Sequence, residues 1–213
     1  MNFLIIDTSV QDSSIALIKK EGIPFTFSIP SARQSIHLLP SIRALLEEHD
    51  LFLSDLSFIA IGTGPGSFTG TRVGVMTAKT LSYGKNIPLI PFCSLMQFTT
   101  QKAGPFTSIV DAKSPGFYIL KGMKTTSATS FENTPKLVSE KELSVLLANG
   151  EVAISPDKKR IEERIGVHYR NLEEANPTFS EIISFSKKQY LSENIVFHKE
   201  VEVIYMSNSS VAY

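Results

Sequence analysis

The sequence predicts an α/β protein built from two related lobes, and two observations carry this prediction. Residues 58–84 read as a buried strand, a loop rich in glycine and proline, and a helix. A second pattern occurs twice, in residues 3–18 and again in residues 108–120: an apolar strand that ends in aspartate, a polar turn and another apolar strand. The two aspartates are Asp7 and Asp111. Repetition of a supersecondary pattern predicts repetition of a structural unit.

The first lobe is expected to open with a hairpin and to continue with strands and helices. Phe25 and Phe27 alternate with polar residues, which is typical of a strand. An apolar stripe predicts a helix from Ser35, and Pro40 must lie near its first turn or kink it. The expected elements are strands 3–6, 14–18, 24–30, 58–61 and 87–92, and helices 35–49, 69–83 and 94–102, with Gly84 as the left-handed stop of the second helix.

Gly104-Pro105 marks the expected domain boundary, which gives an N-terminal lobe of residues 1–104 and a C-terminal lobe of residues 105–213. The charged run from Asp157 to Arg160 is interpreted as a solvated turn. Beyond the repeated hairpin we expect helices over 139–148 and 179–190 and strands over 152–154 and 201–206.

The glycine loop, Gly62–Gly66, has two interpretations. It precedes a helix that Ser67 or Thr69 can cap, and free N–H groups at a helix N-terminus suit an anion. It is neither a Walker loop nor a dinucleotide-binding fingerprint, because no Gly-Lys-Ser/Thr follows and the glycine spacing differs. The alternative is a tight strand-to-helix turn that glycine makes easy.

The helix after this loop carries a stripe of small residues, Gly70, Gly74, Ala78 and Ser82, at every fourth position. Glycine inside a helix costs about 1 kcal/mol relative to alanine, so the two glycines need a compensating close contact. Either the stripe lies against the protein's own sheet, or it meets a helix of another chain. The spacing alone does not distinguish these arrangements.

Composition is typical of a soluble globular protein, with 42% apolar and 20% charged residues. Lys+Arg and Asp+Glu are both 21, so unaided binding to nucleic acid or to an anionic membrane is not expected. Cys93 is the only cysteine, which fits a reducing compartment. The opening residues lack the features of a signal peptide and no apolar run is long enough to span a membrane, so a cytoplasmic location is expected.

Several segments resemble the TsaB (YeaZ) family, the accessory subunit of bacterial threonylcarbamoyladenosine synthesis on tRNA. They are Ile5–Ser9, Leu38–Pro40 and, most specific, Gly64–Gly74, which reads GPGSFTGTRVG. Asp111–Lys113 and Ser209–Ala212 are looser matches. The resemblance is strong over about the first half of the chain.

The resemblance implies a fold and a set of partners. The fold would be two lobes of the actin-like (ASKHA, RNase H-like) type, each with a mixed sheet, the second smaller and degenerate. The partners would be the catalytic subunit TsaD and the ATPase TsaE, with tRNA reached through the complex and a homodimer when the chain is alone. This machine modifies the adenosine 3′ of the anticodon in tRNAs that read codons beginning with A.

The resemblance also implies that the first two helices form a surface for self-association and for TsaD. This favours the partner-helix interpretation of the small-residue stripe. The interface residues expected on that basis are Leu38, Ile42, Leu45, Gly70, Val73, Gly74, Thr77, Ala78 and Leu81.

Two features depart from the family pattern. Gln34 stands where a histidine is frequent, and the Asp-Ala-Arg-x-x-Glu motif is reduced to residues 111–116, DAKSPG. An actin-like site for ATP also needs glycine in both aspartate turns, and both turns lack it. Ser155-Pro156 stands where the adenine loop usually has paired glycines, so autonomous use of ATP is not expected.

Catalysis by the chain alone is therefore not expected, and no cofactor or metal is predicted. Asp7 can hold Mg²⁺ or, as the simpler alternative, accept hydrogen bonds within its own turn. None of the four histidines forms a His-x-x-x-His pair, and Ser67 lacks the Gly-x-Ser-x-Gly nucleophile elbow. Two functions remain: a non-catalytic scaffold that completes a tRNA-modifying enzyme, and a degenerate actin-like phosphotransferase or nucleotidase.

Overall fold

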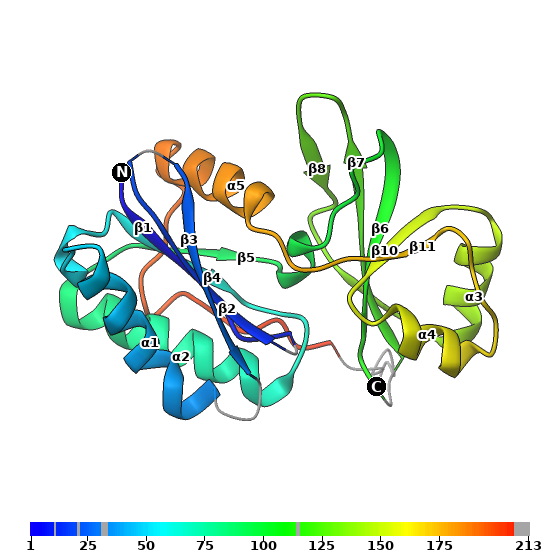
Figure 1. The fold of residues 1–213 in the computed structure, drawn as a ribbon, viewed down its shortest axis with the longest axis horizontal. Helices are drawn as coiled ribbons and strands as arrows, with labels where there is room; N and C mark the ends of the chain where they lie inside the picture. Colours follow the sequence, from blue (N-terminus) through cyan, green and yellow to red (C-terminus); the bar gives the residue numbers. More distant parts are fainter. Residues whose placement is uncertain (11, 21, 31–33, 114–115, 207–213) are drawn as a thin grey trace, which may run out of the picture. The chain divides into compact units, whose positions relative to one another are not determined.

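The computed structural model describes residues 1–206 apart from 11, 21, 31–33 and 114–115. The chain divides into two compact units. The first comprises Met1–Ser94 and Ile182–Ile204, and the second is built mainly from Leu95–Glu181. Figure 1 follows the chain through both. The lobe boundary predicted at residues 104 and 105 concerns the repeated pattern and stays a prediction.

The first unit contains a five-stranded mixed sheet in the order β3-β2-β1-β4-β5. The neighbours β1, β2 and β3 pair antiparallel, while β1, β4 and β5 run parallel. This confirms the predicted opening hairpin and third strand. The bounds are β1 Phe3–Asp7, β2 Asp12–Ile18, β3 Pro24–Pro30, β4 Phe58–Gly62 and β5 Leu89–Phe92.

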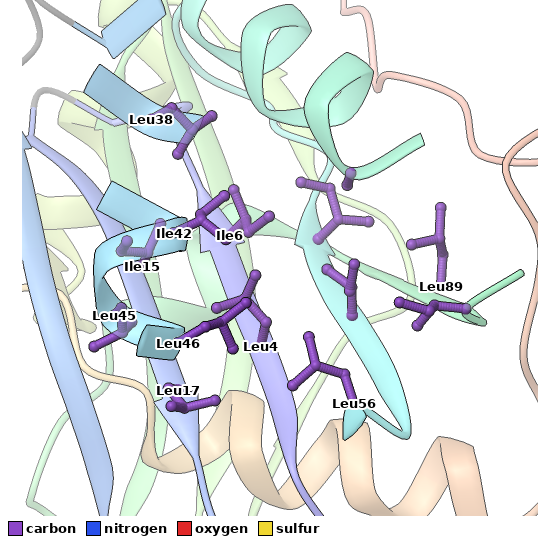
Figure 2. Packing of buried hydrophobic residues seen from close by; sticks show 14 of the residues in the cluster. Leu4, Ile6, Ile15, Leu17, Leu38, Ile42, Leu45, Leu46, Leu56 and Leu89 are labelled. Carbon is purple, nitrogen blue, oxygen red and sulfur yellow. The ribbon is translucent and has the colours of Figure 1, made fainter. Parts of the chain in front are cut away.

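Helices cover both faces of this sheet (Figure 1). On one face lie α1, Gln34–Glu48, and α2, Phe68–Lys85, which enclose the main apolar core with the sheet (Figure 2). On the other lies α5, Ser180–Leu191, whose Tyr190 ring is 4.9 Å from that of Phe58. A short 3₁₀ turn, η2 Leu53–Asp55, precedes β4. In the described residues no helix combines the length and apolar composition that a membrane span requires.

The second unit repeats this topology. Its sheet has the order β11-β10-β6-β7-β8, with β9 also paired to β7. The hairpin β6–β7 corresponds to β1–β2, and β6, β10 and β11 run parallel as β1, β4 and β5 do. Two mixed sheets of the same order confirm the predicted α/β fold with two related lobes. The bounds are β6 Gly104–Asp111, β7 Phe117–Lys124, β8 Thr129–Phe131, β9 Lys136–Val138, α3 Glu140–Ala148, β10 Val152–Ser155, α4 Lys158–Ile165 and β11 Leu172–Glu174.

Several predicted boundaries are wrong. The helix predicted over 94–102 is only a 3₁₀ turn, η3 Ser94–Gln97. Gly84 does not stop α2, which ends at Asn86 in the left-handed conformation with φ 52°. Buried Ser82 fixes this later end, because its carbonyl accepts from the Asn86 N–H and its hydroxyl donates to Ile87 O at 2.7 Å. Of the two arrangements predicted for Pro40, the structure has the one in which it lies inside α1 beyond the first turn.

Two predictions for the second half also fail. Of the segment 157–160, Asp157 lies in a turn before α4 and the other three residues form the first turn of that helix. There lysines pair with glutamates one helical turn ahead, as in Lys158–Glu162 at 3.9 Å. The segment 201–206 is not a strand. It is held by isolated contacts instead: Lys79 Nζ donates to Val201 O at 3.1 Å, and Ile204 N donates to Thr63 O at 2.9 Å.

Candidate functional site

The glycine loop lies directly against the first aspartate turn. Asp7 ends β1 and is fully buried, and its Oδ1 accepts from Ser9 N at 2.8 Å and from Ser9 Oγ at 2.6 Å. Gly62 ends β4 beside it, and a Cβ on Gly62 would lie 2.1 Å from Asp7 Oδ2. Only glycine allows the loop to approach this carboxylate so closely.

The polar groups of the loop are largely used within the chain. Ser67 N donates to Ser9 O at 2.6 Å, and Gly64 N donates to Ser94 Oγ at 3.1 Å. Ser67 caps α2 as predicted, because its Oγ accepts from Gly70 N at 3.2 Å. A Cβ on Gly66 would lie 2.3 Å from Ser9 O. The tight-turn interpretation of the loop is the one that this geometry supports.

Burial raises the pKa of Asp7 above its ordinary value, and hydrogen bonds from Ser9 and Ser94 offset part of that effect. A carboxylate with no exposed surface and with donors already on it is poorly placed to hold a cation. No cluster of three or more metal-ligating side chains occurs in the described part of the chain.

The second aspartate turn is built differently. Asp111 Oδ1 accepts from Lys113 N at 2.8 Å, as Asp7 does from Ser9, but it is also paired with the guanidinium of Arg164 on α4. Arg164 further donates to Glu140 Oε1 at 2.7 Å and lies over the Phe117 ring at 4.5 Å. An arginine therefore fills the space beside this turn. Ser114 and Pro115 of the reduced motif fall outside the described residues, as does the Ser209–Ala212 match.

The small-residue stripe of α2 packs inside the chain, so the explanation of its glycines by a partner helix is wrong. A Cβ on Gly74 would lie 2.2 Å from Thr8 Oγ1, and this hydroxyl donates to Gly70 O at 2.6 Å. Gly70, Gly74 and Ala78 are all buried against the first sheet. The glycines let α2 approach the end of β1.

Three more of the predicted interface residues, Leu38, Ile42 and Leu45, are buried in the core (Figure 2). As described, they offer no surface to a partner. Three residues of α2 are half-buried: Val73, Thr77 and Leu81. The side chains of Val73 and Leu81 pack against the core cluster. The predicted interface therefore mixes core residues with residues near the surface.

These helices expose apolar residues that are not among the predicted interface residues. Ile36 and Leu39 of α1 are 69% and 52% exposed, and Met76 of α2 is 59% exposed. In the Leu-Leu-Pro motif it is Leu38 that points inward and Leu39 that points outward. The helical period gives a signal for Ile36, which lies away from the stripe of Leu38 and Ile42. It gives none for Leu39, which lies two turns before buried Leu46 on the same side of the helix.

Two lobes of identical sheet order, each with an aspartate turn at the end of its first strand, define an actin-like α/β protein. A family model described as TsaD, tRNA N6-adenosine threonylcarbamoyltransferase, matches residues 28–134, half of the chain. The chain is 26% identical to tRNA threonylcarbamoyladenosine biosynthesis protein TsaB of Haemophilus influenzae, covering 98% of this chain and 94% of the relative. It is 28% identical to the protein of that name from Bacillus subtilis, covering 89% and 88%.

Among solved structures, YeaZ from Pseudomonas aeruginosa has the same fold, with a TM-score of 0.80 at 21% identity over 96% of this chain and 99% of that one. The chain belongs to the TsaB (YeaZ) family.

Proposed function

We propose that this chain is a non-catalytic scaffold subunit in tRNA threonylcarbamoyladenosine biosynthesis. It completes a TsaD-like catalytic subunit and works with a TsaE-like ATPase, and tRNA is reached through the complex. The reaction served is threonylcarbamoyl transfer to the adenosine 3′ of the anticodon in tRNAs that read codons beginning with A. The names of the relatives in Haemophilus influenzae and Bacillus subtilis support the pathway.

One observation carries the non-catalytic part of the proposal. The carboxylate that a phosphotransferase would use, Asp7, has no exposed surface, and Ser9 and Gly62 close around it. The amides of Gly64 and Ser67 are engaged within the chain. The groups that would bind phosphate and metal are thus hydrogen-bonded within the first unit, to the Asp7 turn and to Ser94.

The exposed apolar face of α1 and α2 is the surface that we assign to the TsaD-like subunit. The residues matched by the TsaD family model, 28–134, include both helices. A TsaD-like partner should therefore carry an equivalent helix pair, and two equivalent pairs can pack in a near-symmetric way, as in isologous interfaces. Ile36, Leu39 and Met76 are the apolar residues that such packing would bury.

Reconstitution tests this proposal. The chain is combined with its cognate TsaD-like and TsaE-like proteins, ATP, threonine-derived donor and tRNA, and modified tRNA is measured. Omission of the chain should abolish modification. The variants Leu39→Asp and Met76→Asp should reduce complex formation at least tenfold, about 1.4 kcal/mol, while the chain alone stays folded.

The matched control is Val145→Asp on α3, which changes an equally exposed apolar residue of the second unit (56% exposed) and should leave the complex intact. Full modification without the chain would overturn the scaffold role. Loss of the complex in the control as well would overturn the assignment to α1 and α2.

Calorimetry with ATP and Mg²⁺ separates the scaffold from the alternative, a degenerate phosphotransferase or nucleotidase. Because Asp7 is buried, we expect the Kd of the chain for ATP and Mg²⁺ to be higher than about 100 µM, a binding free energy weaker than about −5.5 kcal/mol. Tighter binding that is lost on Asp7→Asn substitution would favour the alternative.

A further inference from the structure

The second unit contains a pocket of about 620 Å³ at the end of its sheet where β6 begins and β7 ends. Its walls are the hairpin β6–β7, β8 and the turn between α3 and β10. Asp111 lies at the opposite end of β6, so the pocket is separate from the second aspartate turn. A volume of this size is typical of small-molecule sites. The lining includes Pro105, Lys121, Met123, Glu132, Gly150 and Glu151.

Two carboxylates line this pocket from opposite sides of the hairpin β6–β7. Glu151 directly precedes β10, which pairs with β6, and Glu132 directly follows β8, which pairs with β7. The two strands between them contribute Pro105 and Met123, which lie opposite each other in the hairpin, and Met123 is 44% exposed. An apolar floor with an acid on each side suits an aliphatic chain that carries a cation at each end.

The cation that now balances the pocket is the chain's own Lys121. Its Nζ lies 3.3 Å from Glu151 Oε2, and Thr107 Oγ1 donates to Glu151 Oε1. The Glu151 side chain is 22% exposed and held from both oxygens, whereas the Lys121 side chain is 41% exposed at the end of a flexible stem. The carboxylate is therefore fixed in place, and the ammonium group beside it can be exchanged for that of a ligand.

The end of α3 adds negative potential to the same wall. Asn149 and Gly150 follow this helix and line the pocket, and the last turn of α3 contains no basic residue. The C-terminus of a helix carries partial negative charge, which favours a cation nearby. Lys136 lies 3.5 Å from Glu132, but these side chains are 62% and 46% exposed, and such pairs contribute at most about 1 kcal/mol. The pocket therefore favours a cation over an anion.

We propose that this pocket binds a short aliphatic diamine. One ammonium group replaces that of Lys121 beside Glu151, and the other pairs with Glu132. The aliphatic chain between them lies over Met123. Both amines are charged at neutral pH, because an alkyl ammonium group such as that of lysine has a pKa of about 10.4.

Titration followed by amide NMR spectra of the full chain tests binding at this place. Putrescine, the four-carbon diamine, should shift the amide signals of the pocket residues Gly122 and Gly150 in a saturable way, with a Kd below about 1 mM. Butylamine has one ammonium group and should bind at least about tenfold more weakly, and the four-carbon diol should not bind. The absence of a saturable shift up to about 10 mM putrescine, or equal affinity for butylamine, would overturn the proposal.

Substitutions distinguish this site from unspecific attraction of a cation. Lys121→Met should tighten putrescine binding by about threefold or more, because it removes the competing ammonium group from Glu151. Glu151→Gln and Glu132→Gln should each weaken binding by about fivefold or more. The matched control is Glu163→Gln, which removes a carboxylate from an exposed pair with Lys159 on α4 and should leave binding unchanged. Weaker binding to Lys121→Met, or an equal loss in the control, would overturn the proposal. If Glu151→Gln fails to fold, Glu132→Gln decides.

Discussion

Two glycines of α2, Gly74 and Gly84, have different surroundings, so the same substitution at each can be compared. Gly74 faces Thr8, where a Cβ would lie 2.2 Å from Oγ1, whereas nothing lies within 4 Å of a Cβ on Gly84. We expect Gly74→Ala to destabilise the chain by about 1–3 kcal/mol, because the hydroxyl that donates to Gly70 O must move. Gly84→Ala should stabilise it by about 0.5–1 kcal/mol, through higher helix propensity. Urea denaturation measures both, and equal effects would refute this account.

The carboxyl of Asp7 makes stability depend on pH. Its pKa in the folded chain is raised by burial above the ordinary 3.8, so the folded state binds more protons than the unfolded state between those two pKa values. The contribution of Asp7 to the free energy of unfolding therefore falls as pH rises between the two pKa values and is constant above the higher one. Asp7→Asn removes the effect and keeps an acceptor for the Ser9 hydroxyl.

Unfolding of the wild type and of Asp7→Asn should be compared from pH 4 to pH 8. The stability of the wild type relative to the variant should decline as pH increases from about 4, and all other carboxyl groups cancel in the comparison. Parallel curves would show that Asp7 is not perturbed in the folded chain.

The segment after α5 stabilises the first unit although it is neither helix nor strand. Val196 N and O exchange hydrogen bonds with Leu89 of β5, at 3.0 and 2.7 Å, and Val201 is buried in the core cluster. We expect Val201→Ala to cost about 1–3 kcal/mol, because the loss of two methyl groups opens a cavity in the core. Val145→Ala on α3, where the side chain is exposed, should change stability by less than about 0.5 kcal/mol. Thermal unfolding of both variants distinguishes this from a segment that merely covers the surface.

Elements with a strong local signal could be predicted from sequence, and those fixed by tertiary contacts could not. The alternation in β3 and the apolar run in β4 give both strands to within one residue of the observed bounds. The short strands β8, β9 and β11 were missed, because three residues carry no usable period. The glycine spacing on α2 correctly signals a close contact, but the nature of the neighbour, Thr8 of the same chain, depends on topology.

The equivalent aspartates of the two lobes, Asp7 and Asp111, have different partners. The effect of this difference on stability can be measured on the whole molecule. Asp7 is enclosed by a glycine loop and hydroxyl groups, whereas Asp111 is paired with Arg164, which also joins α4 to Glu140 on α3. Removing Arg164 takes the nearer cation from a mostly buried carboxylate and leaves it the guanidinium of Arg160, 3.9 Å from Asp111 Oδ2. Arg164→Met should therefore destabilise the second unit by about 3 kcal/mol.

The double variant Arg164→Met/Asp111→Asn separates charge from packing. A neutral amide in the same place is less costly to bury than a carboxylate that has lost its nearer cation, so the double variant should regain part of the lost stability. Calorimetry should show the transition of the second unit shifting down in Arg164→Met and partly returning in the double variant. Additive losses would mean that Arg164 acts through its packing on Phe117 rather than through the charge of Asp111. Asp7 belongs to the first unit and accepts hydrogen bonds from Ser9, so Asp7→Asn should show no comparable coupling to Arg164.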